Sequence, residues 1–280
     1  MSKIKAIIKK IYEKTKEKDI IPIEKVVDKH KILDNKVALI AGGSGGIGMA
    51  IADALLASGC KVILGGTKPQ KLKNCKEHFT SKYQASIETA IINLNDINDF
   101  NEKINILSKI WGKIDIFVNS AGVHTENVDF WAMTPKEYDR VMDINLKGPY
   151  FACLAMAKYW KKNKLKGHIL LISSSRGSEP AFSPYGISKW GINGMTKGLA
   201  EVLINDNIIV NAIAPGSTAT PLLGIYSKND SIYTVDNKFD RMVVPDEIGE
   251  YARMLVSDAG DMVVGEVIHI SGGRGVFDIR

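Results

Sequence analysis

The glycine-rich run Ala41–Gly48 (Ala-Gly-Gly-Ser-Gly-Gly-Ile-Gly) constrains the fold of this chain more than any other segment. It follows a short apolar segment, Lys36–Ala41, with the composition of a buried parallel strand. It leads into a segment with helical periodicity, Gly48–Ser58, which Gly59 ends. A strand, a glycine turn and a helix in this order predict the start of a β-α-β unit whose helix N-terminus can bind phosphate.

The rest of the chain repeats this alternation of strand and helix signals. The further segments predicted as strands are Lys61–Leu64, Ala90–Ile92, Ile114–Asn119, Gly167–Ser173, Ile208–Ile213 and Val263–Ile270. Strands joined by right-handed helical crossovers run parallel, so we predict an α/β fold: a doubly wound, Rossmann-like parallel sheet with helices on both faces. No linker rich in Pro, Gly or Ser interrupts the series, and residues 35–280 are predicted to form one domain.

Charge and cysteine content narrow the class of protein. The formal net charge is +6, but residues 1–36 hold eleven Lys against six Asp or Glu, which leaves only +1 for the rest. A basic tail on a nearly neutral body is not typical of a nucleic-acid-binding domain. The three cysteines are odd in number and lack metal-ligand spacing, so we expect no disulfide framework, no metal and a cytoplasmic location.

Residues 1–34 form a basic extension ahead of this body. Ile4, Ile7, Ile8 and Ile11 recur at helical spacing among lysines, which is the pattern of a basic amphipathic helix. Three alternatives are open for it. The helix can dock on protein, make peripheral contact with an anionic membrane through residues 1–20, or stay disordered.

A tyrosine and a lysine four residues apart form the second chemical signal. Tyr185 and Lys189 share one face of a predicted helix. A free phenol has a pKa of ~10, and a nearby ammonium group lowers it by favouring the phenolate. The pair therefore predicts a general acid/base that works near neutral pH.

Further motifs follow these two in a fixed order. They are Asn119-Ser120-Ala121-Gly122, Asp143-Ile144-Asn145, Ile172 to Gly177, Asn211 to Gly216 with Thr220, and Gly265 to Gly273. In this combination the chain resembles the short-chain dehydrogenase/reductase family over roughly residues 35–274, and within it the 3-oxoacyl-ACP reductases. It departs from the common pattern at Ala41, where Thr is more frequent, and at Ser120, where Asn is.

The resemblance implies an oxidoreductase that moves a hydride between a nicotinamide cofactor and a small-molecule carbonyl or secondary alcohol. In it, Ser174 holds the substrate oxygen and Tyr185 transfers the proton. Lys189 binds the cofactor ribose and tunes the phenol, while Asn145 connects the lysine to solvent. Besides Tyr185 and Lys189, the implied cofactor contacts are Gly42, Ser44, Gly45, Gly46, Ile47, Gly48, Thr67, Lys68, Asn93, Leu94, Asn119, Ala121, Gly122, Pro215, Gly216 and Thr220.

Three consecutive serines compete for the catalytic position. The family usually places its serine slightly farther from the tyrosine than Ser174, which precedes Tyr185 by eleven residues. Gly177 follows Ser174 three residues later, as in the family pattern, and favours this serine. Ser173 is the alternative.

The end of the second predicted strand bears on the choice of cofactor. An Asp or Glu there would bind the adenosine ribose and repel a phosphate on it. This chain has Gly65-Gly66-Thr67-Lys68 and no carboxylate before Glu77. NADP is therefore favoured over NAD, with Thr67 and Lys68 as phosphate contacts.

The substrate class stays open at this stage. Residues 217–245 stand where the family keeps its mobile substrate loop, and they mix apolar with charged side chains. A 3-oxoacyl thioester reductase and a sugar or polyol dehydrogenase both fit. A non-enzymatic dinucleotide sensor is disfavoured, because the Ser, Tyr and Lys set is intact.

The helix predicted after Tyr185 bears on assembly. It carries Gly191, Gly194 and Gly198 on roughly one face, although glycine is costly inside a helix. Together with the family resemblance, this spacing predicts a homodimer or homotetramer.

Overall fold

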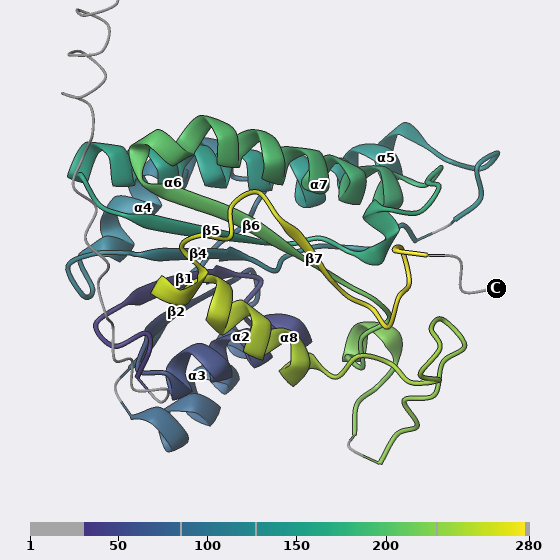
Figure 1. Cartoon of the computed structure of the whole chain (residues 1–280), viewed down its shortest axis with the longest axis horizontal. Helices are drawn as coiled ribbons and strands as arrows, with labels where there is room; N and C mark the ends of the chain where they lie inside the picture. The colour runs from purple at the N-terminus through teal and green to yellow at the C-terminus, as the bar shows by residue number, and fades with distance from the viewer. Residues whose placement is uncertain (1–30, 85, 127, 228, 278–280) are drawn as a thin grey trace, which may run out of the picture.

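A seven-stranded parallel sheet forms the centre of the computed structural model, which describes residues 31–277 except 85, 127 and 228 (Figure 1). The strand order is β3-β2-β1-β4-β5-β6-β7. The strands are β1 (Val37–Ala41), β2 (Lys61–Gly66), β3 (Ile87–Ile91), β4 (Ile116–Asn119), β5 (Gly167–Ile172), β6 (Ile208–Pro215) and β7 (Val267–Ile270). The order reverses between β1 and β4, so the predicted doubly wound α/β fold is confirmed.

Helices cover both faces of this sheet. They are α2 (Gly46–Ala57), α3 (Pro69–Tyr83), α4 (Phe100–Ser108), α5 (Pro135–Met142), α6 (Gly148–Asn163), α7 (Pro184–Leu203) and α8 (Pro245–Leu255). Figure 1 shows α4, α6 and α7 on one side of the sheet and α2, α3 and α8 on the other. Within the described residues no helix combines the length and apolarity needed to cross a membrane.

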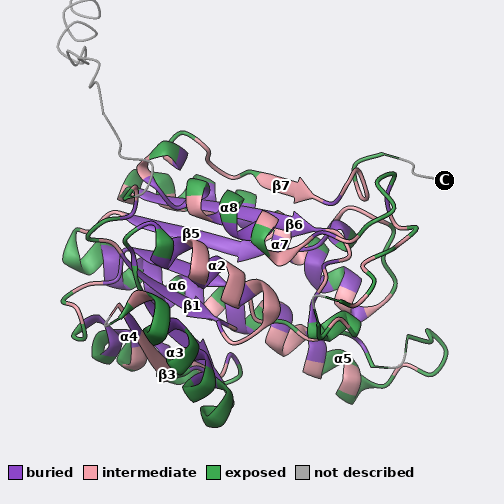
Figure 2. Cartoon of the chain, turned by 90° about the horizontal axis from the view of Figure 1, so that it is seen from below, coloured by how far each residue is buried: buried purple, intermediate pink, exposed green. Residues whose placement is uncertain are grey.

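Each face of the sheet has its own apolar core. Trp160 of α6 and Phe100 of α4 pack on one side, and Leu55 of α2 and Phe79 of α3 pack on the other. Figure 2 shows the central strands buried, the edge strand β7 of intermediate burial and the outward helix faces exposed. Leu33 is fully buried in the second core, and its N–H donates to Ser58 O at 3.0 Å. The amphipathic helix predicted around Ile4, Ile7, Ile8 and Ile11 lies outside the described residues, which include only positions 31–34 of the basic extension.

Several strand boundaries differ from the sequence prediction, and β3, β6 and β7 show how. β3 begins at Ile87, earlier than predicted. The start was missed because this edge strand carries the polar pair Glu88-Thr89 and lacks an apolar run there. β7 begins only at Val267, after Gly265 has turned the chain with a φ of +76°. β6 runs on to Pro215, which brings the end of that strand to the edge of the sheet where the carboxyl ends meet.

The loops after β4, β5 and β6 and the segment after β7 gather at this edge. The long loop between β6 and α8 lies at the same end of the molecule as the C-terminal segment (Figure 1). In a doubly wound sheet, ligands bind in this position.

Candidate active site

The glycine run after β1 brings two loops into backbone contact. Gly42 has a φ of +75°, and a Cβ added there would lie 2.5 Å from the backbone nitrogen of Ala121. A Cβ added to Gly48 would lie 2.3 Å from Gly42 O, so α2 also starts tightly against the turn. Only glycine fits at these two positions without moving the backbone.

The N-terminus of α2 and the end of β4 fit a dinucleotide. Gly45 precedes α2 and provides no side-chain cap, so no capping side chain occupies the first N–H groups of the helix. Thr220 packs against the same turn, where a Cβ on Gly46 would meet its methyl group at 2.6 Å. Asn119 Oδ1 is buried at the end of β4 with no hydrogen-bond partner among the described residues.

The residues predicted to contact the adenosine end lie after β2 and β3. Thr67 and Lys68 are exposed, and α3 has no acidic residue in its first turn. The Asn93 amide is used within its own turn: it accepts from Asn95 N at 3.2 Å and donates to Asp96 Oδ1 at 3.1 Å. Leu94 is buried, and a Cβ on Gly148 would lie 2.4 Å from its carbonyl oxygen.

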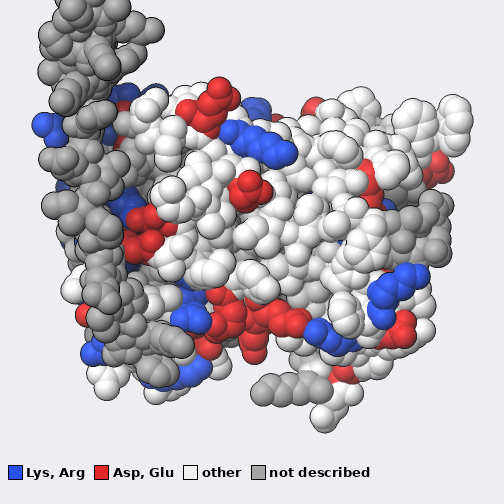
Figure 3. Space-filling model, in the orientation of Figure 1, with Lys and Arg blue, Asp and Glu red and all other residues white. Residues whose placement is uncertain are grey.

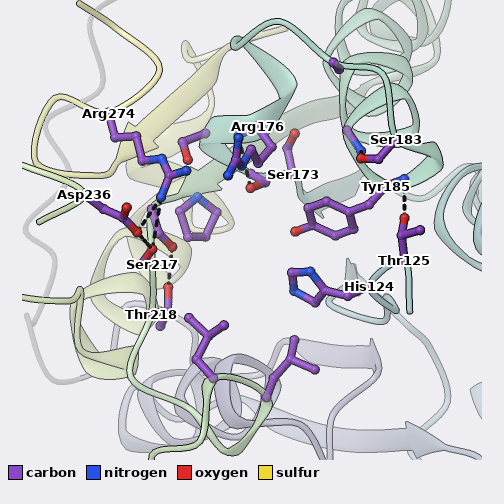
Figure 4. A pocket seen from close by; sticks show the side chains of 18 of the residues that line it. His124, Thr125, Ser173, Arg176, Ser183, Tyr185, Ser217, Thr218, Asp236 and Arg274 are labelled. Atoms are coloured by element: carbon purple, nitrogen blue, oxygen red, sulfur yellow. Dashed lines mark hydrogen bonds and ion pairs between the residues drawn. The ribbon is translucent and has the colours of Figure 1, made fainter. Parts of the chain in front are cut away.

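Local capping places Tyr185 in the first turn of α7. The Ser183 hydroxyl accepts a hydrogen bond from Gly186 N at 3.3 Å, and Pro184 occupies the first helical position. The N–H of Tyr185 donates to Thr125 Oγ1 at 3.2 Å, which ties α7 to the loop after β4 (Figure 4). Lys189 lies one turn later, with its Nζ 5.6 Å from the centroid of the Tyr185 ring.

Lys189 is buried beneath the phenol. Its Nζ donates to Ile172 O, the last residue of β5, at 2.9 Å. Burial lowers the pKa of Lys189 to about 8, because the ammonium form loses its hydration. Lys189 therefore releases its proton at a lower pH than an exposed lysine does.

The pKa of Tyr185 departs from the sequence prediction. Burial raises the pKa of Tyr185, and a hydrogen bond with Ser174 and the charges of Arg176 and Arg274 oppose this rise without overcoming it. The prediction attributed the main influence to Lys189. In the structure that lysine is itself desolvated, and loss of hydration of the phenolate dominates.

The two candidate serines have different partners. Ser173 Oγ donates to Asn193 Oδ1 at 2.5 Å and lies 3.3 Å from Lys189 O, so its hydroxyl is bound to α7. Ser174 Oγ accepts from Arg176 N at 3.2 Å and retains its proton for another acceptor. Of these two serines, only Ser174 acts on the pKa of Tyr185.

Asn145 lies in a π-helical turn, Asp143–Lys147, between α5 and α6. Its side-chain amide pairs with both backbone groups of Val123, accepting from N at 2.8 Å and donating to O at 2.9 Å. It also donates to Ser188 Oγ at 3.3 Å. Asn145 therefore joins the loop after β4 to α7, and a π turn is a common way to aim such a side chain.

A cavity of about 470 Å³ opens above these residues. Among the predicted site residues, those that line it are Ile47, Ser174, Tyr185, Pro215, Gly216 and Thr220. His124, which the sequence did not assign to the site, stacks on Tyr185 with ring centroids 4.2 Å apart and planes 16° apart (Figure 4). Arg176, Asp236 and Arg274 add three charged groups to the wall.

Comparison with known proteins agrees with this geometry. The model of the short chain dehydrogenase family matches residues 36–230. The chain belongs to this family. Short-chain dehydrogenases are oxidoreductases that act on alcohol or carbonyl groups, and the chain is therefore an enzyme of this class.

Three similar proteins illustrate the range of the short-chain dehydrogenases near this chain. A 3alpha-hydroxysteroid dehydrogenase of Mediterraneibacter gnavus is 32% identical over 248 residues, covering 86% of this chain and 97% of the relative. The structure of ElxO with NADP bound is 28% identical with a TM-score of 0.77, covering 85% and 98%. A 3-ketoacyl-(acyl-carrier-protein) reductase of Brucella melitensis in complex with NADH is 26% identical with a TM-score of 0.75, covering 87% and 100%.

Several cavity residues of this short-chain dehydrogenase escaped the sequence prediction. Arg176 stands two residues after Ser174, and its place beside the catalytic-serine motif was the available signal. Arg274 directly follows the glycine pair that ends the last motif. Asp236 lies within the predicted substrate loop, but no local pattern distinguishes it from the other acids there.

Proposed function

We propose that this short-chain dehydrogenase transfers hydride between NADP(H) and a small-molecule ketone or secondary alcohol, with Tyr185 as its acid/base. One observation carries the proposal. The Ser174 hydroxyl and the Tyr185 phenol line one cavity at the carboxyl edge of the sheet, and the buried Lys189 lies beside the phenol, with its Nζ 5.6 Å from the ring centroid.

Each of these side chains has a defined task in carbonyl reduction. The Ser174 hydroxyl, which bonds Tyr185 in the structure, donates a hydrogen bond to the substrate oxygen and holds it beside the phenol. Tyr185, protonated at neutral pH because burial raises its pKa, donates the proton that turns this oxygen into a hydroxyl. Lys189 then restores the proton of the phenol, since its own pKa is close to neutral. When bound, the nicotinamide supplies the hydride, and in the reverse direction it accepts one.

Asn145 acts through other residues in this scheme. Its amide is committed to Val123 and Ser188, so we assign it the task of fixing the loop after β4 against α7. The side chains of Asn145 and Lys189 both lie next to Gly122 in this loop, since a Cβ added there would lie within 4 Å of Asn145 Oδ1 and of Lys189 Nζ. Fixing the loop therefore also keeps Lys189 in place.

The preference for NADP rests on the residues that follow β2. Thr67 and Lys68 are exposed there, and the first turn of α3 adds Lys71 and no acid. Similar proteins bind either cofactor, since ElxO holds NADP and the Brucella reductase holds NADH. The local charge of this chain favours the phosphorylated form.

The three cysteines support a reducing, cytoplasmic location for this activity. Cys60, Cys75 and Cys153 are all buried as free thiols. Burial raises the pKa of Cys153 to about 12, so this thiol is unreactive.

The test of the proposed function is NADPH oxidation by the purified chain across ketone classes, together with the Tyr185→Phe variant. Turnover by Tyr185→Phe should fall by ~10²–10⁴-fold, because the proton donor is lost. NADPH binding, followed by fluorescence titration, should be retained. A variant that keeps more than about a tenth of the wild-type rate would show that another group transfers the proton.

A further inference from the structure

Arg176 is placed to touch the same molecule as Ser174. It lies in the turn Ser175–Gly177, and its N–H donates to Ser174 Oγ at 3.2 Å. Its side chain is 54% exposed and lines the cavity that contains Tyr185 (Figure 4). A ligand held by Ser174 therefore comes within reach of the guanidinium.

The charge of Arg176 is only partly neutralised. Glu179 Oε2 accepts from Arg176 at 3.0 Å, while Oε1 of the same carboxylate lies 2.8 Å from Arg274 Nε. Arg274 has a second carboxylate, Asp236, at 2.5 Å, and its side chain is 13% exposed. The Glu179 carboxylate is thus shared by the guanidinium groups of Arg176 and Arg274. Of these two arginines, Arg176 is the more exposed.

At the reacting end of the cavity the three cations Arg176, Arg274 and Lys189 outnumber the two carboxylates Glu179 and Asp236. The charged groups that act on Tyr185 are Arg176 and Arg274, and those that act on His124 are Lys189 and Arg176. All of them are cations. Because burial reduces screening, these charges favour an anion in the cavity more than they would at an open surface.

We infer that Arg176 binds a carboxylate of the substrate, and that the substrates of this site are oxo acids and the matching hydroxy acids. The inference rests on the proposed function, since it deepens the specificity of the same site. A guanidinium offers paired N–H donors that match the two charged oxygens of a carboxylate, whereas a thioester or a neutral ketone offers a single uncharged carbonyl oxygen. Glu179 holds Arg176 from one side, so little side-chain freedom is lost on binding.

The experiment compares oxo acids with their methyl esters. Acetoacetate and levulinate, each beside its ester, differ in the distance between ketone and carboxylate. We expect the wild type to reduce at least one acid with a kcat/KM about 10- to 100-fold above that of its ester. In Arg176→Gln this acid-to-ester ratio of kcat/KM should fall to about one, mainly through a change in KM. Arg176→Lys should restore part of the ratio, because lysine returns the positive charge but not the paired N–H donors.

Arg253→Gln is the matched control. Arg253 bonds Glu250 three residues away on α8, as Arg176 bonds Glu179, but it does not line the cavity. Its variant should keep the wild-type ratio.

As a readout without turnover, the Tyr185→Phe complex with NADP should bind the preferred acid in a calorimetric titration and lose that binding when Arg176→Gln is added.

Any of four results would overturn the inference. Equal kcat/KM for acids and esters in the wild type would do so, as would an unchanged ratio in Arg176→Gln. If neutral ketones are reduced and oxo acids are not, the proposed function stands and the inference fails. If NADPH binds and no ketone of either kind reacts, both fail.

Discussion

At the scale of single residues, burial and charge act against each other in this site. Lys189 is 5% exposed, and within the described part of the chain its Nζ has the Ile172 carbonyl as its one hydrogen-bond acceptor, so burial makes its ammonium form costly. Tyr185 is held in its neutral form by the same burial. The proposed function therefore requires a buried lysine that lowers the stability of the folded protein.

The first prediction concerns the stability of Lys189→Met. The pKa of Lys189 is lowered from 10.5 to about 8, which corresponds to about 3 kcal/mol of destabilisation at pH 7. Methionine removes this cost and loses a hydrogen bond worth ~1 kcal/mol, so the variant should be about 2 kcal/mol more stable in denaturant unfolding at pH 7.

The pH dependence of this difference follows from proton linkage. Between about pH 8 and 10.5 the unfolded chain binds more protons at this lysine than the folded protein does, so wild-type stability rises with pH. The advantage of Lys189→Met should therefore shrink across this interval. An advantage that stays constant from pH 7 to pH 10 would contradict the assigned cause.

The second prediction concerns Thr67→Asp and the choice of cofactor. A carboxylate directly after β2 repels the phosphate of NADP and accepts bonds from a free ribose. The kcat/KM for NADPH should fall relative to that for NADH by about 10- to 100-fold. Lys73→Asp, on an exposed position of α3, is the control for general charge and should leave the ratio unchanged. A wild type that prefers NADH would refute the assignment before any variant is made.

At the scale of elements, α7 has two functional faces. One face carries Tyr185 and Lys189 into the site. The other presents Ile187 and Trp190 to solvent in the isolated chain, and much of the surface over α7 is uncharged in Figure 3. On this face a Cβ added to Gly194 or to Gly198 meets no atom within 4 Å, so packing within the chain does not require glycine there.

The third prediction is that this face joins two copies of the chain. Glycine costs ~1 kcal/mol relative to alanine inside a helix. Close approach of a second α7 would explain why Gly194 and Gly198 are glycines. Light scattering should show a homodimer or homotetramer at micromolar concentration, and Gly194→Arg should reduce its mass. Gln70→Arg, on the exposed side of α3, should not. A wild-type monomer would exclude the assembly.

At the scale of the whole molecule, the sheet gathers residues far apart in sequence at one edge. The residues that line the main cavity lie between Ile47 and Arg274. The core near the start of the body includes Leu33 and Ile32. Every described residue that lines the cavity therefore follows the basic extension in the sequence.

The fourth prediction follows from this separation. A chain beginning at Ile32 should bind NADPH and turn over substrate with a kcat within about two-fold of the full chain, because it keeps every described residue of the cavity and of the core. Co-sedimentation with anionic liposomes tests the membrane alternative for residues 1–20. Pelleting of the full chain alone would support it, and equal pelleting of both chains, or of neither, would exclude it.

The sequence by itself determined the fold class, the strand order along the chain, the glycine turn at Gly42 and the spacing of Tyr185 and Lys189. These features are local: a φ of +75° demands glycine, and residues four apart share a helix face wherever the helix packs. Only the tertiary structure decided the wall of the cavity. Arg274 meets Glu179 across 95 residues of sequence and Ser217 across 57, and no local pattern encodes such contacts. The pKa of Tyr185 was also decided there, because it depends on how completely the packed protein excludes water from the phenol.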